Sequence, residues 1–481
     1  MSTTPPASLS VIDELIQFVD DNSEIKSFFA PTDVTDFNEL LKRFLRSTMD
    51  QVRANTALQC TRQILKVSDL DDLELFREGV WKREARGVIK FPGQRDHTAH
   101  TLNNWLLGWY LYCRLPTLQQ AMAKAIERRQ WRSDTRGPSF FFGHAWLNVS
   151  LLHDIGYLFE GALDATDPGY QNEHAAIGLR TANEYFQFFF WKHMRVDAID
   201  DRSVVLDEEQ ELPKAPPDPT MTEIAMYLRT LDRDMKPLYA QVRKRVPEDL
   251  LPEANFSSDA FELWKAHYQA AKVPSMVRRI ECLEEAYIEH ATRELPGTGV
   301  RVLDHGTCSG LLQLKIATLY YRLFASLDAR LADATSSESA KSTIRKLLKR
   351  EDALDHPFDF EYWWSGIVWA TAACAVHNMQ QQNNWPAAYR PGKLGLADDP
   401  LAYLGILVDS IQDWDRYMVF HSRTRVPIQG IDVKLKIQDG RAVVEFPPEQ
   451  KDRVGKLKKE LDNALDGWDK LVLLLPSASD S

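Results

Sequence analysis

The residues with the clearest chemical potential are an adjacent histidine and aspartate, His153 and Asp154. They lie in the apolar run LLHDIGY, from Leu151 to Tyr157, which we interpret as a helix end. A carboxylate beside an imidazole is costly to bury there unless a cation or hydrogen-bond partners compensate it. Neighbouring helical side chains point about 100° apart, so both can reach one ion beside the helix. The pair therefore predicts a buried metal site.

Further histidines and one aspartate lie in similarly apolar, helical contexts elsewhere in the chain. Imidazole and carboxylate ligands suit Mn, Fe, Co, Ni, Zn or Mg and do not select sharply among them. We therefore expect one or two divalent metal ions as the cofactor, of open identity. The additional candidates are His97, His100, His305, His377 and Asp409.

The order of these residues resembles that of the HD-domain superfamily of metal-dependent phosphohydrolases, in which a His is followed by His-Asp, further His and a final Asp. The resemblance covers roughly Arg95 to Arg416, and its tightest pieces are His153–Gly156 and Leu401–Arg416. It implies an all-α, HD-domain-like helical bundle. It also implies the ligands, with His100, His153, Asp154 and Asp409 holding one ion and His305 and His377 completing a two-metal site.

Two of these ligand positions have alternatives. His97 and His100 are three residues apart and share one helix face. We favour His100 because the apolar run from Leu102 continues as the first helices of the family do. His174 lies 20 residues after Asp154 and competes with His305 for the third-ligand position.

One position departs from the family pattern. Where many members have a lysine shortly after His-Asp, this chain has Tyr157, so another cation must steady an anionic substrate. Carboxylates near the ligands could orient the attacking water or support a ligand histidine. The candidates are Arg95, Arg345 and Lys349 for substrate binding, and Asp154, Asp304 and Glu160 for catalysis.

The resemblance implies an enzyme that hydrolyses a nucleotide or another small phosphoester through a metal-activated water. The same ligand set also resembles di-iron oxygenases of the superfamily, which oxidise their substrates. A third reading is a regulatory protein that binds metal and nucleotide without turnover. The formal charge of −11 and the pI near 5.6 make duplex nucleic acid an unlikely bulk partner.

Helical periodicity dominates the elements that must position these residues. Apolar residues recur at spacings of three and four in several segments, and Ser10 can act as the N-cap of the first. The segments are Ser10–Asp21, Phe37–Leu45, His100–Leu115, Leu312–Leu327 and Leu401–Trp414. An all-α body is the natural prediction.

Two regions interrupt this pattern. Arg195–Thr220 is rich in acidic residues and proline, which predicts a solvated linker, and Met221–Arg293 reads as a helical insertion or lid. Late in the chain, alternating apolar residues flank Asp439-Gly440, which predicts a β-hairpin. We expect a terminal amphipathic helix from about Asp452 to Leu473.

These breaks divide the chain of 481 residues into five regions. Residues 1–85 form an N-terminal helical region, 86–194 and 301–420 the two parts of the HD-like core, 195–300 the acidic linker and insertion, and 421–481 the hairpin and terminal helix. The five cysteines are scattered without a CxxC pair, which favours a reducing compartment. No apolar run approaches the roughly 20 residues needed to span a bilayer. We therefore expect a cytoplasmic protein without a membrane partner.

Overall fold

The computed structural model describes residues 9–28, 34–47, 50–67, 73–87, 97–129, 137–158, 260–292, 304–314, 317, 338, 360–379, 391–414 and 430–477. Most of these residues are helical and a few form short strands, which confirms the predicted class. Several predictions fall outside the described residues: the acidic linker, most of the insertion and the side chains of Arg95, Glu160, His174, Arg345 and Lys349.

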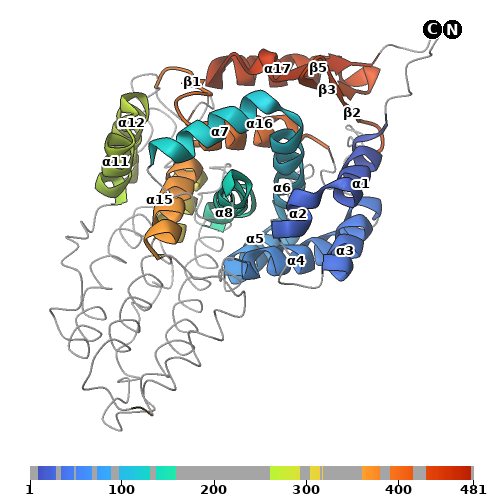
Figure 1. Ribbon diagram of the computed structural model, residues 1–481, viewed down its shortest axis with the longest axis horizontal. Coiled ribbons are helices and arrows are strands. Elements are labelled where there is room, and N and C mark those ends of the chain that lie inside the picture. Colours follow the sequence, from blue (N-terminus) through green and yellow to red (C-terminus); the bar gives the residue numbers. More distant parts are fainter. Residues whose placement is uncertain are drawn as a thin grey trace.

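Helices form the body of the molecule (Figure 1). They are α1 (Val11–Asp21), α2 (Ser23–Phe28), α3 (Val34–Arg46), α4 (Asp50–Lys66), α5 (Glu74–Gly87), α6 (His97–Arg114), α7 (Pro116–Arg128), α8 (Gly137–Leu152), α11 (Ala260–Ala270), α12 (Pro274–Thr292), α15 (Phe360–Val376), α16 (Pro400–Ile411) and α17 (Lys451–Ala464). Residues 305–314 are also helical. Short 3-10 turns occur at Ile155–Leu158, Pro448–Gln450 and Trp468–Lys470.

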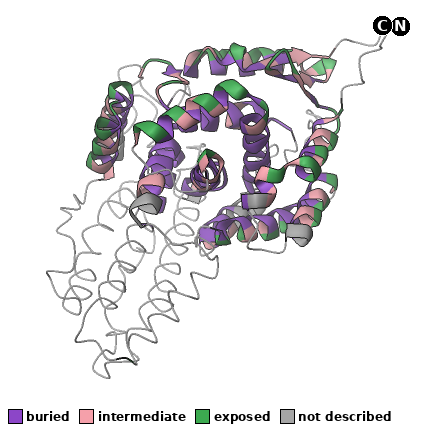
Figure 2. Ribbon diagram, in the orientation of Figure 1, coloured by how far each residue is buried: buried purple, intermediate pink, exposed green. Residues whose placement is uncertain are grey.

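Helix α8 lies at the centre, with α6, α15 and α16 packed around it (Figures 1 and 2). Its sequence is apolar on all sides, as expected of a helix surrounded by protein. Trp146 of α8 is buried, and its Nε1 donates to the backbone oxygen of Trp105 at 3.0 Å. A Cβ on Gly108 of α6 would lie 2.0 Å from the Trp146 ring, so glycine is required for this close approach. The end of α8, where His153 and Asp154 follow, is thereby fixed in the core.

The described part of the predicted insertion, α11 and α12, packs against the main body. Trp264 Nε1 donates to Thr371 Oγ1 of α15 at 3.0 Å, and the Tyr268 hydroxyl donates to Asp399 Oδ2 at 2.7 Å. Asp399 is buried and caps α16, where its Oδ1 accepts from the first backbone amides of that helix. Helix α11 is therefore joined to both α15 and α16.

The C-terminal region contains the predicted hairpin. Strands β2 (Lys434–Gln438) and β3 (Arg441–Phe446) pair antiparallel, and Asp439 and Gly440 take the positive φ values of 51° and 73° that the tight turn needs. The backbone amide of Val11 donates to the Val433 oxygen at 2.7 Å, so the start of α1 is tied to this sheet. The N-cap prediction for α1 is also confirmed, because Ser10 Oγ accepts from the amide of Asp13.

The prediction of one terminal helix from Asp452 to Leu473 is wrong. Helix α17 ends at Ala464, β4 (Leu465–Asp466) pairs in parallel with β1 (Leu394–Gly395), and β5 (Val472–Pro476) pairs in parallel with β3. Gly467 has a φ of 63°, a left-handed conformation that a helix interior does not contain. The apolar run after it is a strand because β3 offers a free edge for pairing. Within the described residues, no helix is both long and apolar enough to cross a bilayer.

Candidate metal centre

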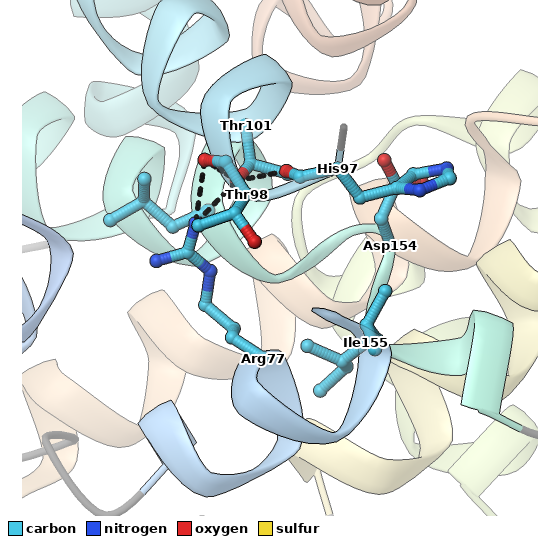
Figure 3. Close-up of a pocket in the computed structure, with 8 residues that line it drawn as sticks. Arg77, His97, Thr98, Thr101, Asp154 and Ile155 are labelled. Carbon is cyan, nitrogen blue, oxygen red and sulfur yellow. Dashed lines mark hydrogen bonds between the residues drawn. The ribbon is translucent and has the colours of Figure 1, made fainter. Parts of the chain in front are cut away.

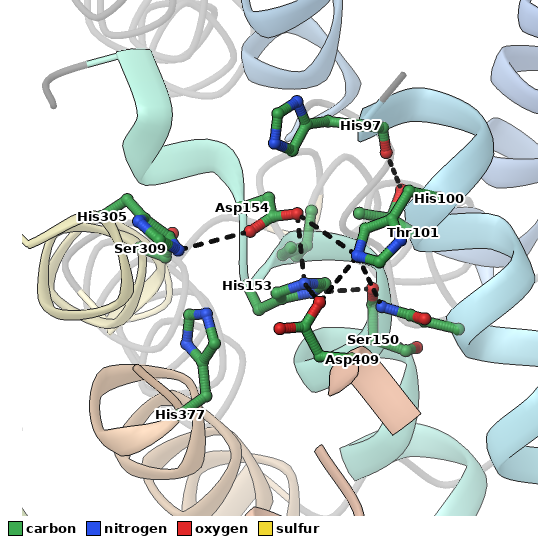
Figure 4. Close-up of polar contacts among 12 residues, drawn as sticks. His97, His100, Thr101, Ser150, His153, Asp154, His305, Ser309, His377 and Asp409 are labelled. Atoms are coloured by element: carbon green, nitrogen blue, oxygen red, sulfur yellow. Dashed lines mark hydrogen bonds and ion pairs between the residues drawn. The ribbon is translucent and has the colours of Figure 1, made fainter. Parts of the chain in front are cut away.

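The predicted ligands come from five separate elements and meet at one place (Figure 4). His100 lies in the first turn of α6, His153 and Asp154 directly follow α8, and His305 begins the helical segment 305–314. His377 directly follows α15, and Asp409 lies in the last turn of α16. The four histidines and Asp154 are all buried. The structure thus brings together residues that are more than 300 positions apart in the sequence.

The shortest contacts surround two carboxylates. Asp409 Oδ1 lies 2.7 Å from His100 Nε2 and 3.6 Å from His153 Nε2. Asp154 Oδ2 lies 3.2 Å from His153 Nε2 and 3.9 Å from His100 Nε2. The other oxygen of Asp154, Oδ1, lies 3.6 Å from His305 Nε2. Asp154 therefore has one oxygen on each side of the cluster.

Two groups of donors in this cluster are compact enough to hold an ion. His100, His153 and Asp409 form one group, and His153, Asp154 and His377 form the other; within each, the ligand atoms all lie within 4.8 Å of one another. His305 belongs to neither group. The described residues therefore contain ligand sets that could hold a divalent metal ion, as the sequence predicted.

Three of the histidines are oriented by acceptors behind their rings. The Nδ1 of His153 lies 3.0 Å from the backbone oxygen of Ser150, and the Nδ1 of His377 lies 2.6 Å from that of Cys374. His100 Nδ1 contacts the side-chain oxygen of Gln412. Because these partners only accept, each Nδ1 of a neutral ring carries the hydrogen and each Nε2 presents a lone pair to the cluster. This is the tautomer that binds a metal through Nε2.

Two buried atoms of the cluster make no hydrogen bond to any described residue. They are His153 Nε2 and Asp154 Oδ2, which approach each other without hydrogen-bond geometry. Buried polar atoms of this kind normally have a partner, and an ion is one such partner. The donor set and these two atoms therefore fit a bound cation.

The electrostatics of the cluster favour one proton on His153 when no metal is bound. Burial opposes the charged ring, but the carboxylates of Asp154 and Asp409 outweigh it and raise the pKa of His153 to about 10. The pKa of Asp154 is held well below its usual range because His153 overcomes the effect of burial. Burial, together with the neighbouring His153 and His305, lowers the pKa of His377 to about 4.

Metal binding should therefore release a proton. The pKa of His153 is raised to about 10, so the ring is protonated throughout the range from pH 6 to 8 and must lose this proton to bind an ion. We expect the affinity for Mn²⁺ to rise about tenfold for each pH unit in this range. Competition titrations at pH 6, 7 and 8 measure the slope. Equal affinities at the three pH values would contradict the assignment of His153 as a ligand.

Gln412 contacts a candidate ligand, and sequence reasoning missed it. The sequence predicted a helix as far as Trp414, but α16 ends at Ile411. Gln412 is buried just beyond this end, and its Nε2 donates to the Trp414 oxygen at 2.9 Å. Its side-chain oxygen is thereby directed at His100. No sequence pattern signals this role, because it depends on where the helix stops and on a contact across 312 positions.

Replacing Gln412 tests this support of His100. Gln412→Leu removes the acceptor at Nδ1 and should weaken Mn²⁺ binding about 10- to 100-fold. Gln412→Glu keeps an acceptor at this position and should retain the affinity within a few-fold, although both variants lose the bond to Trp414. Isothermal titration of the two variants separates the outcomes. Equal losses in both would assign Gln412 to packing alone.

His97 faces a different side of the site from His100. Its ring lies 4.2 Å from the ring of Tyr157, measured between centroids, and burial lowers its pKa to about 3. Tyr157 in turn stacks on His305 at 3.9 Å with an interplanar angle of 14°. The geometry therefore places His100, and not His97, in a potential ligand group. The ring of Tyr157 therefore lies between the rings of His97 and His305.

A small pocket lies beside Asp154 (Figure 3). It has room for about one water molecule, and its polar lining is Arg77, His97, Thr98, Thr101 and Asp154. Arg77 is buried and donates to Thr101 Oγ1 at 2.6 Å and to the Thr98 oxygen at 3.1 Å. Its Nη1 also lies 3.4 Å from Glu74 Oε2, so the charge of Arg77 is paired with a buried carboxylate beside the same pocket as Asp154. Sequence reasoning did not find Arg77, because α5 has no motif that marks it.

Asp304 does not contact the compact ligand groups directly. It caps the helical segment 305–314, where its Oδ2 accepts from the backbone amide of Thr307 at 2.7 Å. Its Oδ1 accepts from Asn378 Nδ2 at 2.8 Å, and Asn378 also contacts His305. Of the two predicted roles, support of a histidine is the one that these contacts favour.

No protein-family model matches this chain, and no curated protein or solved structure is significantly similar to it. The resemblance to the HD-domain superfamily therefore rests on the residues of the sequence and stays a prediction.

Proposed function

We propose that this protein is a metal-dependent phosphohydrolase that acts on a nucleotide or another small phosphoester. The observation that carries the proposal is the convergence of three Nε2 lone pairs, from His100, His153 and His377, on the carboxylates of Asp154 and Asp409. Such a buried set of imidazoles and carboxylates suits a divalent ion. The resemblance in ligand order points to phosphoester hydrolysis as the reaction.

A divalent ion at this place would supply a Lewis acid for a phosphoryl oxygen and a water of lowered pKa as the nucleophile. The residues of the chain hold and orient the reactants. Asp154 directs Oδ2 toward His153 and Oδ1 toward His305, so one oxygen can bind the ion while the other faces His305.

The proposal is tested on the wild-type protein by elemental analysis followed by a phosphate-release screen. We expect one or two divalent ions per chain and metal-dependent release of phosphate from nucleotides or small phosphoesters. Protein treated with a chelator should be inactive until Mn²⁺ or another divalent ion is restored. A protein that takes up no metal after reconstitution, or that takes it up and hydrolyses no phosphoester in the screen, would contradict the proposal.

One observation favours a second candidate function. Tyr157 stands where the resembling family has a phosphate-contacting lysine, and its ring contacts His97 and His305. A di-iron oxygenase needs no such lysine. Two irons per chain with O₂ uptake, in the absence of phosphate release, would identify this candidate. Metal and nucleotide binding without either activity would identify a regulatory protein.

A further inference from the structure

The hydrogen bonds behind His305 differ from those behind the other histidines. They begin with Asp304, whose Oδ2 accepts from the amide of Thr307 at 2.7 Å and from its hydroxyl at 2.9 Å. The second oxygen, Oδ1, accepts from Asn378 Nδ2 at 2.8 Å. All of these residues are buried. The orientation of the Asp304 carboxylate is therefore fixed by the start of a helix.

This carboxylate fixes the amide of Asn378. A carboxylate oxygen accepts, so the group facing Asp304 must be the amide nitrogen and not the amide oxygen. The same Nδ2 lies 3.4 Å from His305 Nδ1. An amide nitrogen only donates, so His305 Nδ1 must accept. The proton of the neutral His305 ring is therefore on Nε2.

His305 thus has the opposite tautomer to His100, His153 and His377. Its Nε2–H faces the cluster, 3.6 Å from Asp154 Oδ1 (Figure 4). A protonated Nε2 is a donor and has no lone pair for a metal. The position of His305 outside both compact ligand groups agrees with this. Its ring is held in place by stacking on Tyr157.

We propose that His305 is a hydrogen-bond donor to a phosphoryl oxygen of the substrate and not a metal ligand. The inference rests on the proposed function and replaces the ligand role that the family resemblance implied for this residue. Asn378 sets the tautomer and Tyr157 sets the ring plane, so a rigid donor stands beside Asp154. This donor takes up the contact to phosphate that the absent lysine would make.

The test compares His305→Ala with His377→Ala in protein loaded with Mn²⁺. Elemental analysis should find the wild-type Mn content in His305→Ala and a reduced content in His377→Ala. Calorimetry with inorganic phosphate should show binding to the loaded wild-type protein and binding weakened about tenfold or more in His305→Ala, the loss expected for one hydrogen bond to a charged group. His305→Gln, which retains a side-chain N–H, should recover part of the phosphate affinity.

Asn378→Ala provides a second variant that leaves the His305 ring in place. It removes the donor to Nδ1, so it should weaken phosphate binding while the Mn content stays at the wild-type value. A fall in Mn content in His305→Ala, or an unchanged phosphate affinity in both variants, would overturn the inference but not the proposed function. No Mn²⁺ uptake by the wild-type protein would overturn both.

Discussion

Asp154→Asn should abolish high-affinity metal binding while the chain still folds. The substitution keeps the shape of the side chain but removes the negative charge that two sides of the cluster share, with oxygens 3.2 Å from His153 Nε2 and 3.6 Å from His305 Nε2. Loss of a residue that only supports a ligand already weakens metal binding about 10- to 100-fold. We therefore expect at least about a 100-fold loss for Asp154→Asn. Phosphate release should fall with it.

His144→Gln is the matched control. His144 lies on α8, the helix that precedes the His-Asp pair, but its ring packs against Phe28 and Phe140, with centroids 5.2 Å and 4.4 Å away. Elemental analysis and far-ultraviolet circular dichroism on both variants give metal content and folding independently. Wild-type metal content in a folded Asp154→Asn protein would remove Asp154 from the ligand set and with it the centre of the proposed site.

The free energy of unfolding of the metal-free protein should depend on pH through the interaction of His153 with Asp154. The pKa of His153 is raised to about 10, so its stabilising contribution is complete below the unfolded value of about 6.5 and is lost as the pH rises through 10. The pKa of Asp154 is lowered, so its contribution is present above about 4 and is lost in acid. Urea unfolding in EDTA should therefore show the largest difference between wild type and Asp154→Asn near pH 5 to 6. A difference that grows toward pH 10 would contradict the pairing.

The sequence predicted correctly those elements that are determined by interactions between neighbouring residues. Ser10 caps α1 because its side chain reaches the amide of Asp13, and the Asp439-Gly440 turn forms because these two residues accept positive φ. The last helix was predicted too long because Val472–Pro476 is an apolar run without a clear period. Such a run becomes a strand only when a neighbour such as β3 offers an edge.

The candidate site likewise contains residues that the sequence predicts and residues that only the fold brings together. Histidine and aspartate in apolar helices are visible in the sequence, because burial of these side chains demands compensation. The partners that orient them are not visible, since Gln412 and Asn378 reach His100 and His305 across 312 and 73 positions. The sequence alone favours His100 over His97, but the contact that distinguishes the two residues is made by the fold. The two residues share a helix face, but only the ring of His100 is directed at Asp409.

The backbone packs so closely around Gly156 that adding a single methyl group there should lower the stability of the protein considerably. A Cβ on Gly156 would lie 2.0 Å from the backbone oxygen of His305 and 2.7 Å from the amide nitrogen of Ser309. Both atoms belong to the backbone, so a rotamer change cannot relieve the clash. The amide of Gly156 also donates to Ser309 Oγ at 2.7 Å, which holds the turn after Asp154 against the helical segment 305–314.

Gly156→Ala should therefore destabilise the protein by about 1–3 kcal/mol or more, as overpacking in a rigid core does. It should also weaken phosphate binding, because separating the turn from the segment moves His305 away from Asp154. Gly455→Ala in α17 is the control with the opposite sign: a Cβ there meets no atom within 4 Å, and alanine in a helix stabilises by about 0.5–1 kcal/mol relative to glycine. Urea unfolding of the two variants compares them directly. If Gly156→Ala were as stable as wild type, the segment carrying His305 could not lie against the His-Asp turn, and His305 could not act beside Asp154.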